Sequence, residues 1–170
     1  MRRLLLEGII RRPFAAAPPA AGDAEIAALA ASLDAAARRK LGRSLAIRQV
    51  DAGSCNGCEL EIHALNNIFY DLERFGLTFV ASPRHADVLM VTGPVTKNMR
   101  EALERTYAAT PSPKWVVAVG DCAGDGGVFA GSYAVSGGVS AVLPVDLTIA
   151  GCPPTPTALL KGLLALIEAR

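Results

Sequence analysis

Two nearly continuous apolar runs constrain the fold of this chain more than any other feature. They read ADVLMVTG (residues 86–93) and KWVVAVGD (residues 114–121). Runs of this length and composition are typical of strands that are buried on both faces of a parallel sheet. Parallel strands need crossover connections, which are usually helices. We therefore expect helices before, between and after these two runs.

The rest of the chain from residue 44 follows the same alternation of strand and helix patterns. Further strands are expected at residues 45–51, 77–81 and 146–150, and helices at residues 59–76, 98–110 and 156–170. Strands that alternate with helices predict an α/β fold, in which helices cover both faces of a parallel sheet.

The first 43 residues form an N-terminal arm in this interpretation, and residues 44–170 form the domain. A short basic and apolar segment at residues 1–12 is followed by a linker rich in Pro and Ala at residues 13–22. Residues 23–42 consist of helix formers and predict a helix. Its apolar face is mostly Ala and Leu, so either it lies on a partner or a membrane surface, or it packs on its own domain.

Composition excludes several classes of protein. Hydrophobic residues make up 51% of the chain, which excludes a disordered protein, and the net charge of +1 gives no basic field for nucleic acid. Glu7, Arg11 and Arg12 interrupt the apolar start of the chain, which argues against a secretory signal. A cytoplasmic protein is favoured, and its cysteines are then expected to be reduced thiols or metal ligands.

All four cysteines of the chain fall just past the expected carboxyl end of a strand. Cys55 and Cys58 follow the first strand, Cys122 follows the run KWVVAVGD, and Cys152 follows the last strand. The carboxyl ends of parallel strands lie at one edge of the sheet, where ligands bind. The sequence therefore predicts that four distant thiols meet there and form a metal site.

Either a zinc ion or an iron–sulfur cluster fits four thiolates. The cysteines are separated by 2, 63 and 29 residues, which rules out a local zinc knuckle. Three further details favour the cluster. Pro153 follows the last cysteine, as in ferredoxin-type sites, and glycines in the ligand loops allow close backbone approach. Cys58 begins a helix, where the helix dipole stabilises a thiolate. A thioredoxin-like dithiol would leave Cys122 and Cys152 without a role.

Three stretches, GSCNGCELEI, VVAVGDCA and IAGCPPTPTALLKGL, carry a family resemblance over residues 44–170. In this order they resemble the small, cluster-bearing subunit of nickel–iron hydrogenases and its relative, the 20-kDa subunit of NADH:quinone oxidoreductase (complex I). The resemblance implies a flavodoxin-like fold that holds one [4Fe–4S] cluster. Its ligands would be Cys55, Cys58, Cys122 and Cys152.

The Cys-Asn-Gly-Cys pattern resembles the hydrogenases, since the complex I subunit has two adjacent cysteines instead. One cluster in a short chain resembles the complex-I-related, membrane-bound hydrogenases, such as formate hydrogenlyase, hydrogenase-4 and the energy-converting types. This implies a non-catalytic electron-transfer subunit between a ferredoxin-like iron–sulfur subunit and the nickel–iron centre of a large subunit. With membrane subunits of the same complex, the chain would lie at the cytoplasmic, inner face of the cell membrane.

Further side chains near the first motif are candidates for a role in the site. Glu61 lies where the family has an acidic residue close to the partner, so a role in proton movement is a hypothesis, with helix capping as the alternative. Glu59 is expected to be solvated or at an interface. His63 and His85 are expected to have structural or surface roles. The Gly- and Ser-rich stretch at residues 123–140 is expected to be an interface loop.

Two other functions remain open at this stage. One is a complex I type subunit that passes electrons to quinone, and the other is a structural zinc-binding module without a redox role.

Overall fold

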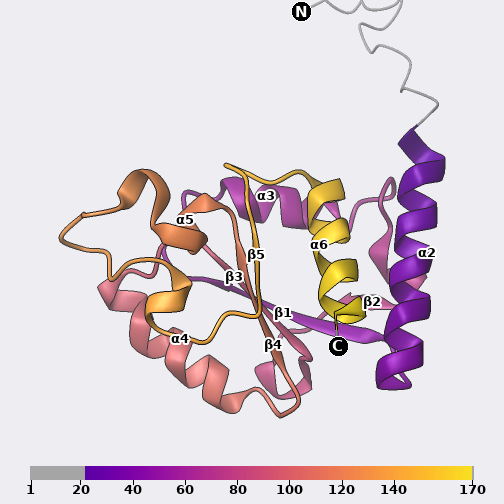
Figure 1. The fold of residues 1–170 in the computed structure, drawn as a ribbon, viewed down its shortest axis with the longest axis horizontal. Coiled ribbons are helices and arrows are strands. Elements are labelled where there is room, and N and C mark those ends of the chain that lie inside the picture. The colour runs from indigo at the N-terminus through magenta and orange to yellow at the C-terminus, as the bar shows by residue number, and fades with distance from the viewer. Residues whose placement is uncertain (1–21, 170) are drawn as a thin grey trace, which may run out of the picture.

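The computed structural model describes residues 22–169, which form a five-stranded parallel sheet with helices on both faces (Figure 1). In chain order the strands are β1 (Leu45–Asp51), β2 (Leu77–Phe79), β3 (Val88–Thr92), β4 (Trp115–Val119) and β5 (Leu147–Ile149). Their order across the sheet is β2-β1-β3-β4-β5, which is the flavodoxin-like order. The expected fold class is therefore confirmed.

All neighbouring strands are parallel, so their carboxyl ends lie at the same edge of the sheet. β1 pairs with β3 as far as Asp51 and Thr92, but its pairing with β2 stops at Ile47 and Phe79. The central strands β3 and β4 are buried along their whole length, as the two apolar runs predict. The last residues of β1 thus extend beyond their outer neighbour.

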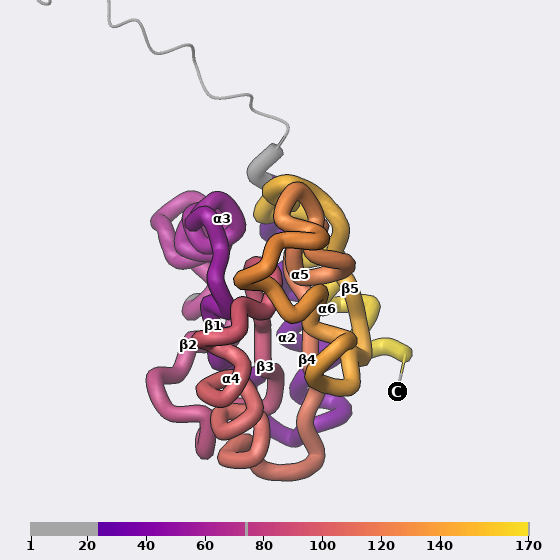
Figure 2. The backbone as a smooth tube through the Cα atoms, turned by 90° about the vertical axis from the view of Figure 1, so that its left-hand side faces the viewer, coloured from indigo at the N-terminus to yellow at the C-terminus, as the bar shows by residue number. Residues whose placement is uncertain are grey.

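The helices follow the strands in alternation and divide between the two faces of the sheet. They are α2 (Gly22–Leu41), α3 (Gly57–Ala64), α4 (Lys97–Ala109), α5 (Asp121–Asp125) and α6 (Pro156–Glu168), with short 3-10 helices η1 (Leu72–Phe75), η2 (Pro83–His85), η3 (Gly127–Phe129) and η4 (Val139–Ala141). One core lies between the sheet and α2, α3 and α6, and a second lies beneath α4 and the loop after α5. Figure 2 shows α3 and α5 at the same end of the molecule.

The helix expected at residues 59–76 is much shorter, because α3 already ends at Ala64. The side chain of Asn67 accepts hydrogen bonds from the backbone N–H groups of Phe69 and Tyr70, at 2.9 and 3.1 Å. Such side-chain bonds compete with the helical backbone pattern and favour a turn. The prediction of one long helix was wrong, and the turn leaves Ile68 fully exposed.

Helix α2 packs one face on its own domain, as one of the two alternatives left open by the sequence expects. Leu33, Ala36 and Ala37 are buried in the core, and α2 contacts α6. Lys40 donates a hydrogen bond to the carbonyl of Glu168 at the end of α6, at 3.1 Å. The expectations for residues 1–21 lie outside the described residues, and the domain boundary at residue 43 remains a prediction. No helix of residues 22–169 is both long and apolar enough to cross a membrane.

Truncating Leu33 tests how much α2 contributes to stability. We expect Leu33→Ala to lower the free energy of unfolding by about 2–5 kcal/mol, because it removes a fully buried side chain and leaves a cavity. Ser32→Ala is the matched control, since Ser32 is exposed on the same helix and bonds only the carbonyl of Ala28. Urea unfolding measures both changes. Equal stabilities of the two variants would show that α2 does not belong to the cooperative core.

Candidate metal centre

The four cysteines line one cavity of about 100 Å³ at the carboxyl edge of the sheet. Cys122 is buried, Cys58 is half-buried, and Cys55 and Cys152 are exposed. The structure thus brings together all four residues that the sequence selected, from the segments that follow β1, β4 and β5. Cys55 and Cys152 lie in loops, Cys58 lies in α3 and Cys122 in α5. Gly93, after β3, lines the same cavity.

The loop that carries Cys55 is held by the side chain of Asp51, the last residue of β1. Its Oδ1 accepts hydrogen bonds from the N–H groups of Gly53 and Ser54, both at 2.7 Å. The Ser54 hydroxyl oxygen accepts a bond from the N–H of Asn56, which adopts the left-handed conformation and begins α3. This chain of bonds fixes the path of the backbone between Cys55 and Cys58.

The loops that carry Cys122 and Cys152 are tied directly to each other. The N–H of Asp121 donates to the carbonyl of Gly151 at 3.0 Å, and Asp121 Oδ1 accepts from the N–H of Gly151 at 2.8 Å. The N–H of Gly120 donates to the carbonyl of Ile149 at 2.8 Å, so the connection continues the β4–β5 pairing. Asp121 therefore fixes the separation of two candidate ligands. Sequence reasoning missed both Asp51 and Asp121, although an Asp before a Gly-rich turn is a recognised turn signal.

Substitution of Asp121 tests this tie. We expect Asp121→Ala to cost about 1 kcal/mol in stability, because the Gly151 N–H loses its acceptor at an exposed site. Asp121→Asn keeps an acceptor oxygen and should lose much less. Urea unfolding measures the stability, and the rate of iron loss to a chelator reports the position of the ligand loops. Identical behaviour of both variants would mean that the hydrogen bond does not hold the loops.

The two less exposed thiols of this cavity, Cys58 and Cys122, resist ionisation. Burial raises the pKa of Cys58 to about 11, and the nearby Glu59 and the three other cysteines add to the increase. Burial also raises the pKa of Cys122, with Cys152 and Cys55 contributing. Because the thiolate is the form that binds metal, a positive metal group must displace these protons.

Glu59 is only 5% exposed, so the expectation that it is solvated or at an interface was wrong. Together with Ile62 it forms the buried side of α3, and neither carboxylate oxygen has a hydrogen-bond partner among the described residues. The helical spacing of Glu59 and Ile62, three residues apart, places them on one face. That face turns inward because α3 packs against α6.

The other candidate residues do not line the cysteine cavity. Glu61 is half-buried on α3, and the structure shows no capping hydrogen bond at the N-cap of that helix. His63 and His85 are exposed and line no part of the cysteine cavity. In the expected interface loop, Val128 is 81% and Tyr133 is 89% exposed.

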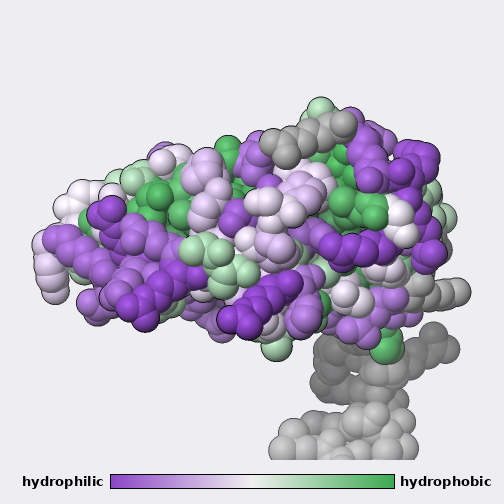
Figure 3. All heavy atoms as spheres, turned by 90° about the horizontal axis from the view of Figure 1, so that it is seen from below, coloured by the Kyte–Doolittle hydropathy of each residue, from purple (hydrophilic) through white to green (hydrophobic). Residues whose placement is uncertain are grey.

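Exposed apolar side chains gather on α3, on the turn after it and on the loop after α5. They are Leu60, Ile68, Phe69, Val128, Phe129 and Tyr133. Helix α3 with the turn after it, and the loop after α5, lie at the end of the sheet that carries the cysteines (Figure 1). By contrast, the face of the molecule seen in Figure 3 is largely hydrophilic, with smaller hydrophobic areas between.

A flavodoxin-like domain with four cysteines at the carboxyl edge of its sheet is the class that fold and cavity define. The chain belongs to the family of the 20-kDa subunit of NADH ubiquinone oxidoreductase, whose model matches residues 55–166. The match runs from the first cysteine into α6 and so includes all four. The resemblance stated from the sequence is confirmed, and the family is one of oxidoreductase subunits related to complex I.

Individual relatives lie on the hydrogenase side of this family. Formate hydrogenlyase subunit 7 of Escherichia coli is 46% identical over 143 residues, which cover 82% of this chain but 56% of that protein. The chain therefore spans little more than half the length of this relative. A probable membrane-bound hydrogenase subunit of Pyrococcus furiosus is also 46% identical, over 75% of this chain and 77% of its own length.

One solved structure with the same fold belongs to a respiratory membrane complex. It is a chain of the membrane-bound sulfane sulfur reductase, an archaeal respiratory complex, with a TM-score of 0.66 and 35% sequence identity. The match covers 81% of this chain and 74% of that chain. The fold is thus found in a chain of a membrane-bound respiratory complex.

Proposed function

We propose that this chain is an electron-transfer subunit that holds one [4Fe–4S] cluster through Cys55, Cys58, Cys122 and Cys152. It would relay electrons between a ferredoxin-like iron–sulfur subunit and the nickel–iron centre of a hydrogenase large subunit. The observation that carries the proposal is that four cysteines from the segments after three different strands line one cavity. When bound, such a cluster accepts and releases an electron at a potential that its surroundings set.

The donor set supports a cluster more than a zinc ion. A zinc ion needs thiolates that converge on one point at about 2.3 Å. Among residues 22–169, no group of three or more Cys, His, Asp or Glu side chains is arranged to hold a single ion. The four thiols instead line one cavity of about 100 Å³, which leaves room for a metal group larger than one ion. An all-thiolate set is also the usual ligation of an iron–sulfur cluster.

The residues around the cavity would position the ligands and tune the potential. Asp51 and Asp121 fix the ligand loops, and Gly120 and Gly127 let the backbone approach the sulfur atoms of Cys58 and Cys122. The buried carboxyl group of Glu59 adjoins Cys58. Charge and solvent access near a cluster are the main means by which a protein sets its potential.

The choice of a hydrogenase rests on the first motif and on the relatives. The Cys-Asn-Gly-Cys motif matches the hydrogenase pattern, and two relatives are named as formate hydrogenlyase and membrane-bound hydrogenase subunits. The name of the Pyrococcus furiosus relative also supports membrane subunits as partners. A peripheral position at the inner face of the cell membrane is part of the proposal and follows from the resemblance stated from the sequence. A second candidate is a related complex without hydrogenase activity, which the similarity to the sulfane sulfur reductase favours.

Glu61 keeps its proposed role in proton movement or at the interface with the large subunit. The side chain is half-buried on α3, three residues after Cys58. We expect Glu61→Ala to lower turnover of the assembled complex while its iron content stays normal. Unchanged turnover would contradict this role.

Metal analysis of the anaerobically purified complex tests the proposed function. We expect iron and acid-labile sulfide in the amount of one four-iron cluster for this subunit, an EPR signal after reduction with dithionite, and nickel in the large subunit. A nickel-free partner with the cluster present would favour the second candidate. One zinc ion with no sulfide and no signal would overturn the electron-transfer role.

A further inference from the structure

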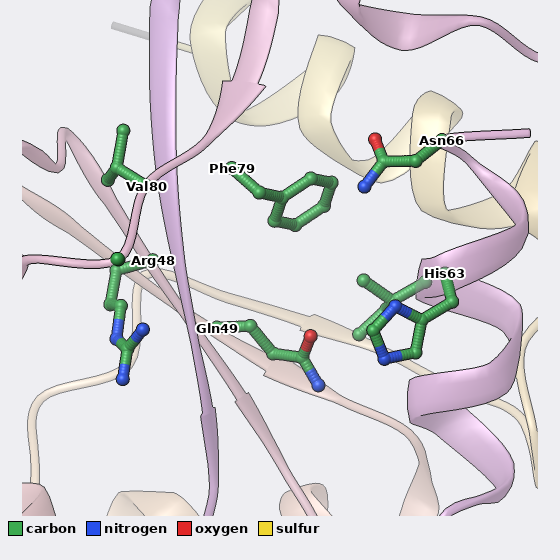
Figure 4. Close-up of a pocket in the computed structure, with 8 residues that line it drawn as sticks. Arg48, Gln49, His63, Asn66, Phe79 and Val80 are labelled. Carbon is green, nitrogen blue, oxygen red and sulfur yellow. The ribbon is translucent and has the colours of Figure 1, made fainter.

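A second cavity lies away from the cysteines, at the outer edge of β1, and has a volume of about 260 Å³. We call it the edge notch, and Figure 4 labels the lining residues Arg48, Gln49, His63, Asn66, Phe79 and Val80. Gln49 and Phe79 turn toward His63 and Asn66, whereas Arg48 and Val80 lie to the other side (Figure 4). The notch therefore wraps around the edge of the sheet at the point where β2 ends.

The backbone of β1 is unpaired along this notch. The carbonyl of Ile47 accepts the N–H of Val80 at 2.8 Å on the outer side, and the carbonyl of Ala46 accepts the N–H of Asp87 on the β3 side. Backbone groups alternate sides along a strand, so those of Gln49 also face outward. No strand of residues 22–169 continues β2 beyond Phe79 to pair with them. Unpaired strand edges are templates for pairing with another chain.

The polar side chains of the notch also lack partners within the described part of the chain. Arg48 Nε is buried without a hydrogen-bond partner, and no ion pair of residues 22–169 involves this guanidinium. Gln49, His63 and Asn66 line the same space, and no acidic side chain does. Arginine stays protonated and matches a carboxylate geometrically. The notch therefore offers a fixed positive charge beside open strand donors and acceptors.

We infer that the edge notch binds an extended segment of a partner subunit, which pairs with β1 at Gln49 and places a carboxylate side chain on Arg48. The inference rests on the proposed place of the chain in a multi-subunit complex. Addition of a strand to an open edge supplies main-chain hydrogen bonds, and the flanking side chains give specificity. A small apolar molecule would fill the space but would leave both the backbone groups and the Arg48 charge unsatisfied. The occupant is therefore an acidic peptide segment.

Two variants of Gln49 separate backbone pairing from side-chain effects in the assembled complex. Gln49→Pro removes the outward N–H and leaves the pairing of Arg48 and Val50 with β3 intact, whereas Gln49→Ala keeps the N–H. We expect the Pro variant to reduce recovery of this subunit with its partners about tenfold or more, and the Ala variant to behave as wild type. Hydrogen exchange at the Gln49 amide of the wild-type complex should be slow. Fast exchange at this amide in the wild-type complex, together with normal recovery of the Pro variant, would overturn the inference.

Arg48 is tested by charge reversal and by photo-crosslinking in the same purified complex. Arg48→Glu should weaken retention of this subunit in the complex about tenfold or more, because it places a carboxylate opposite the carboxylate of the partner segment. Arg39→Glu serves as control, since Arg39 is an exposed residue of α2. A benzophenone side chain at Asn66 should cross-link to one acidic segment of a partner, and an acid-to-lysine change there should restore the Arg48→Glu variant. A lipid or small-molecule adduct, or no rescue, would refute the peptide. Iron and sulfide content, measured alongside, reports on the proposed function independently.

Discussion

Replacing Cys152 by Ala is expected to remove the metal group with little damage to the fold. Cys152 is exposed at the rim of the cavity, so the change deletes a thiol without opening a hole in the core. Loss of a residue that hydrogen-bonds to a metal ligand already costs about 10–100-fold in metal affinity, and the loss of a ligand itself should cost more. Cys122→Ala should have the same effect on iron, with some added destabilisation because Cys122 is buried.

The measurement is iron, acid-labile sulfide and EPR of the complex purified anaerobically. Ser140→Ala is a control of similar size, since Ser140 is exposed and does not line the cavity. It should keep full iron and sulfide. Full retention of the cluster in the Cys152→Ala complex would exclude Cys152 as a ligand and would leave the four-thiolate site incomplete.

The sheet and the position of the cysteines could be predicted because both depend on local patterns. The buried strands β3 and β4 are continuous apolar runs, and a parallel α/β sheet has one ligand-binding edge whatever its loops contain. Given that edge, Cys122 and Cys152 had to come near the first motif, although 63 residues separate Cys58 from Cys122. The helical periodicity after Cys58 was misleading, because the side chain of Asn67 competes with the helix.

The supporting residues of the site could not be found in the same way, because their roles depend on tertiary geometry. Asp121 holds Gly151 across two loops that are 30 residues apart, and no local pattern specifies that pairing. The burial of Glu59 follows from the rotation of α3 on α6, which its eight residues do not encode by amphipathicity. The edge notch depends on the early end of β2, which is likewise a property of the folded sheet.

Gly120 provides the sharpest test that the cavity needs its backbone close to sulfur. This residue adopts φ 87° and ψ 162°, a conformation that is essentially restricted to glycine. An added Cβ would lie 2.6 Å from the sulfur of Cys58 and 3.3 Å from the carbonyl oxygen of Gly151. Gly120→Ala must therefore displace a candidate ligand or the backbone of the neighbouring loop. We expect it to lose most of its iron and to destabilise the protein by more than about 2 kcal/mol.

Gly131→Ala is the matched control for this substitution. Gly131 also has a positive φ of 79°, but nothing lies within 4 Å of the position that its Cβ would take. The control should cost only about 1–2 kcal/mol of backbone strain and should retain its iron. Urea unfolding and iron analysis of both complexes separate the cost of conformation from the cost of crowding at the cavity. Equal iron contents would show that the approach of Gly120 to Cys58 is incidental to metal binding, and a lower content in Gly120→Ala alone would tie this glycine to the site.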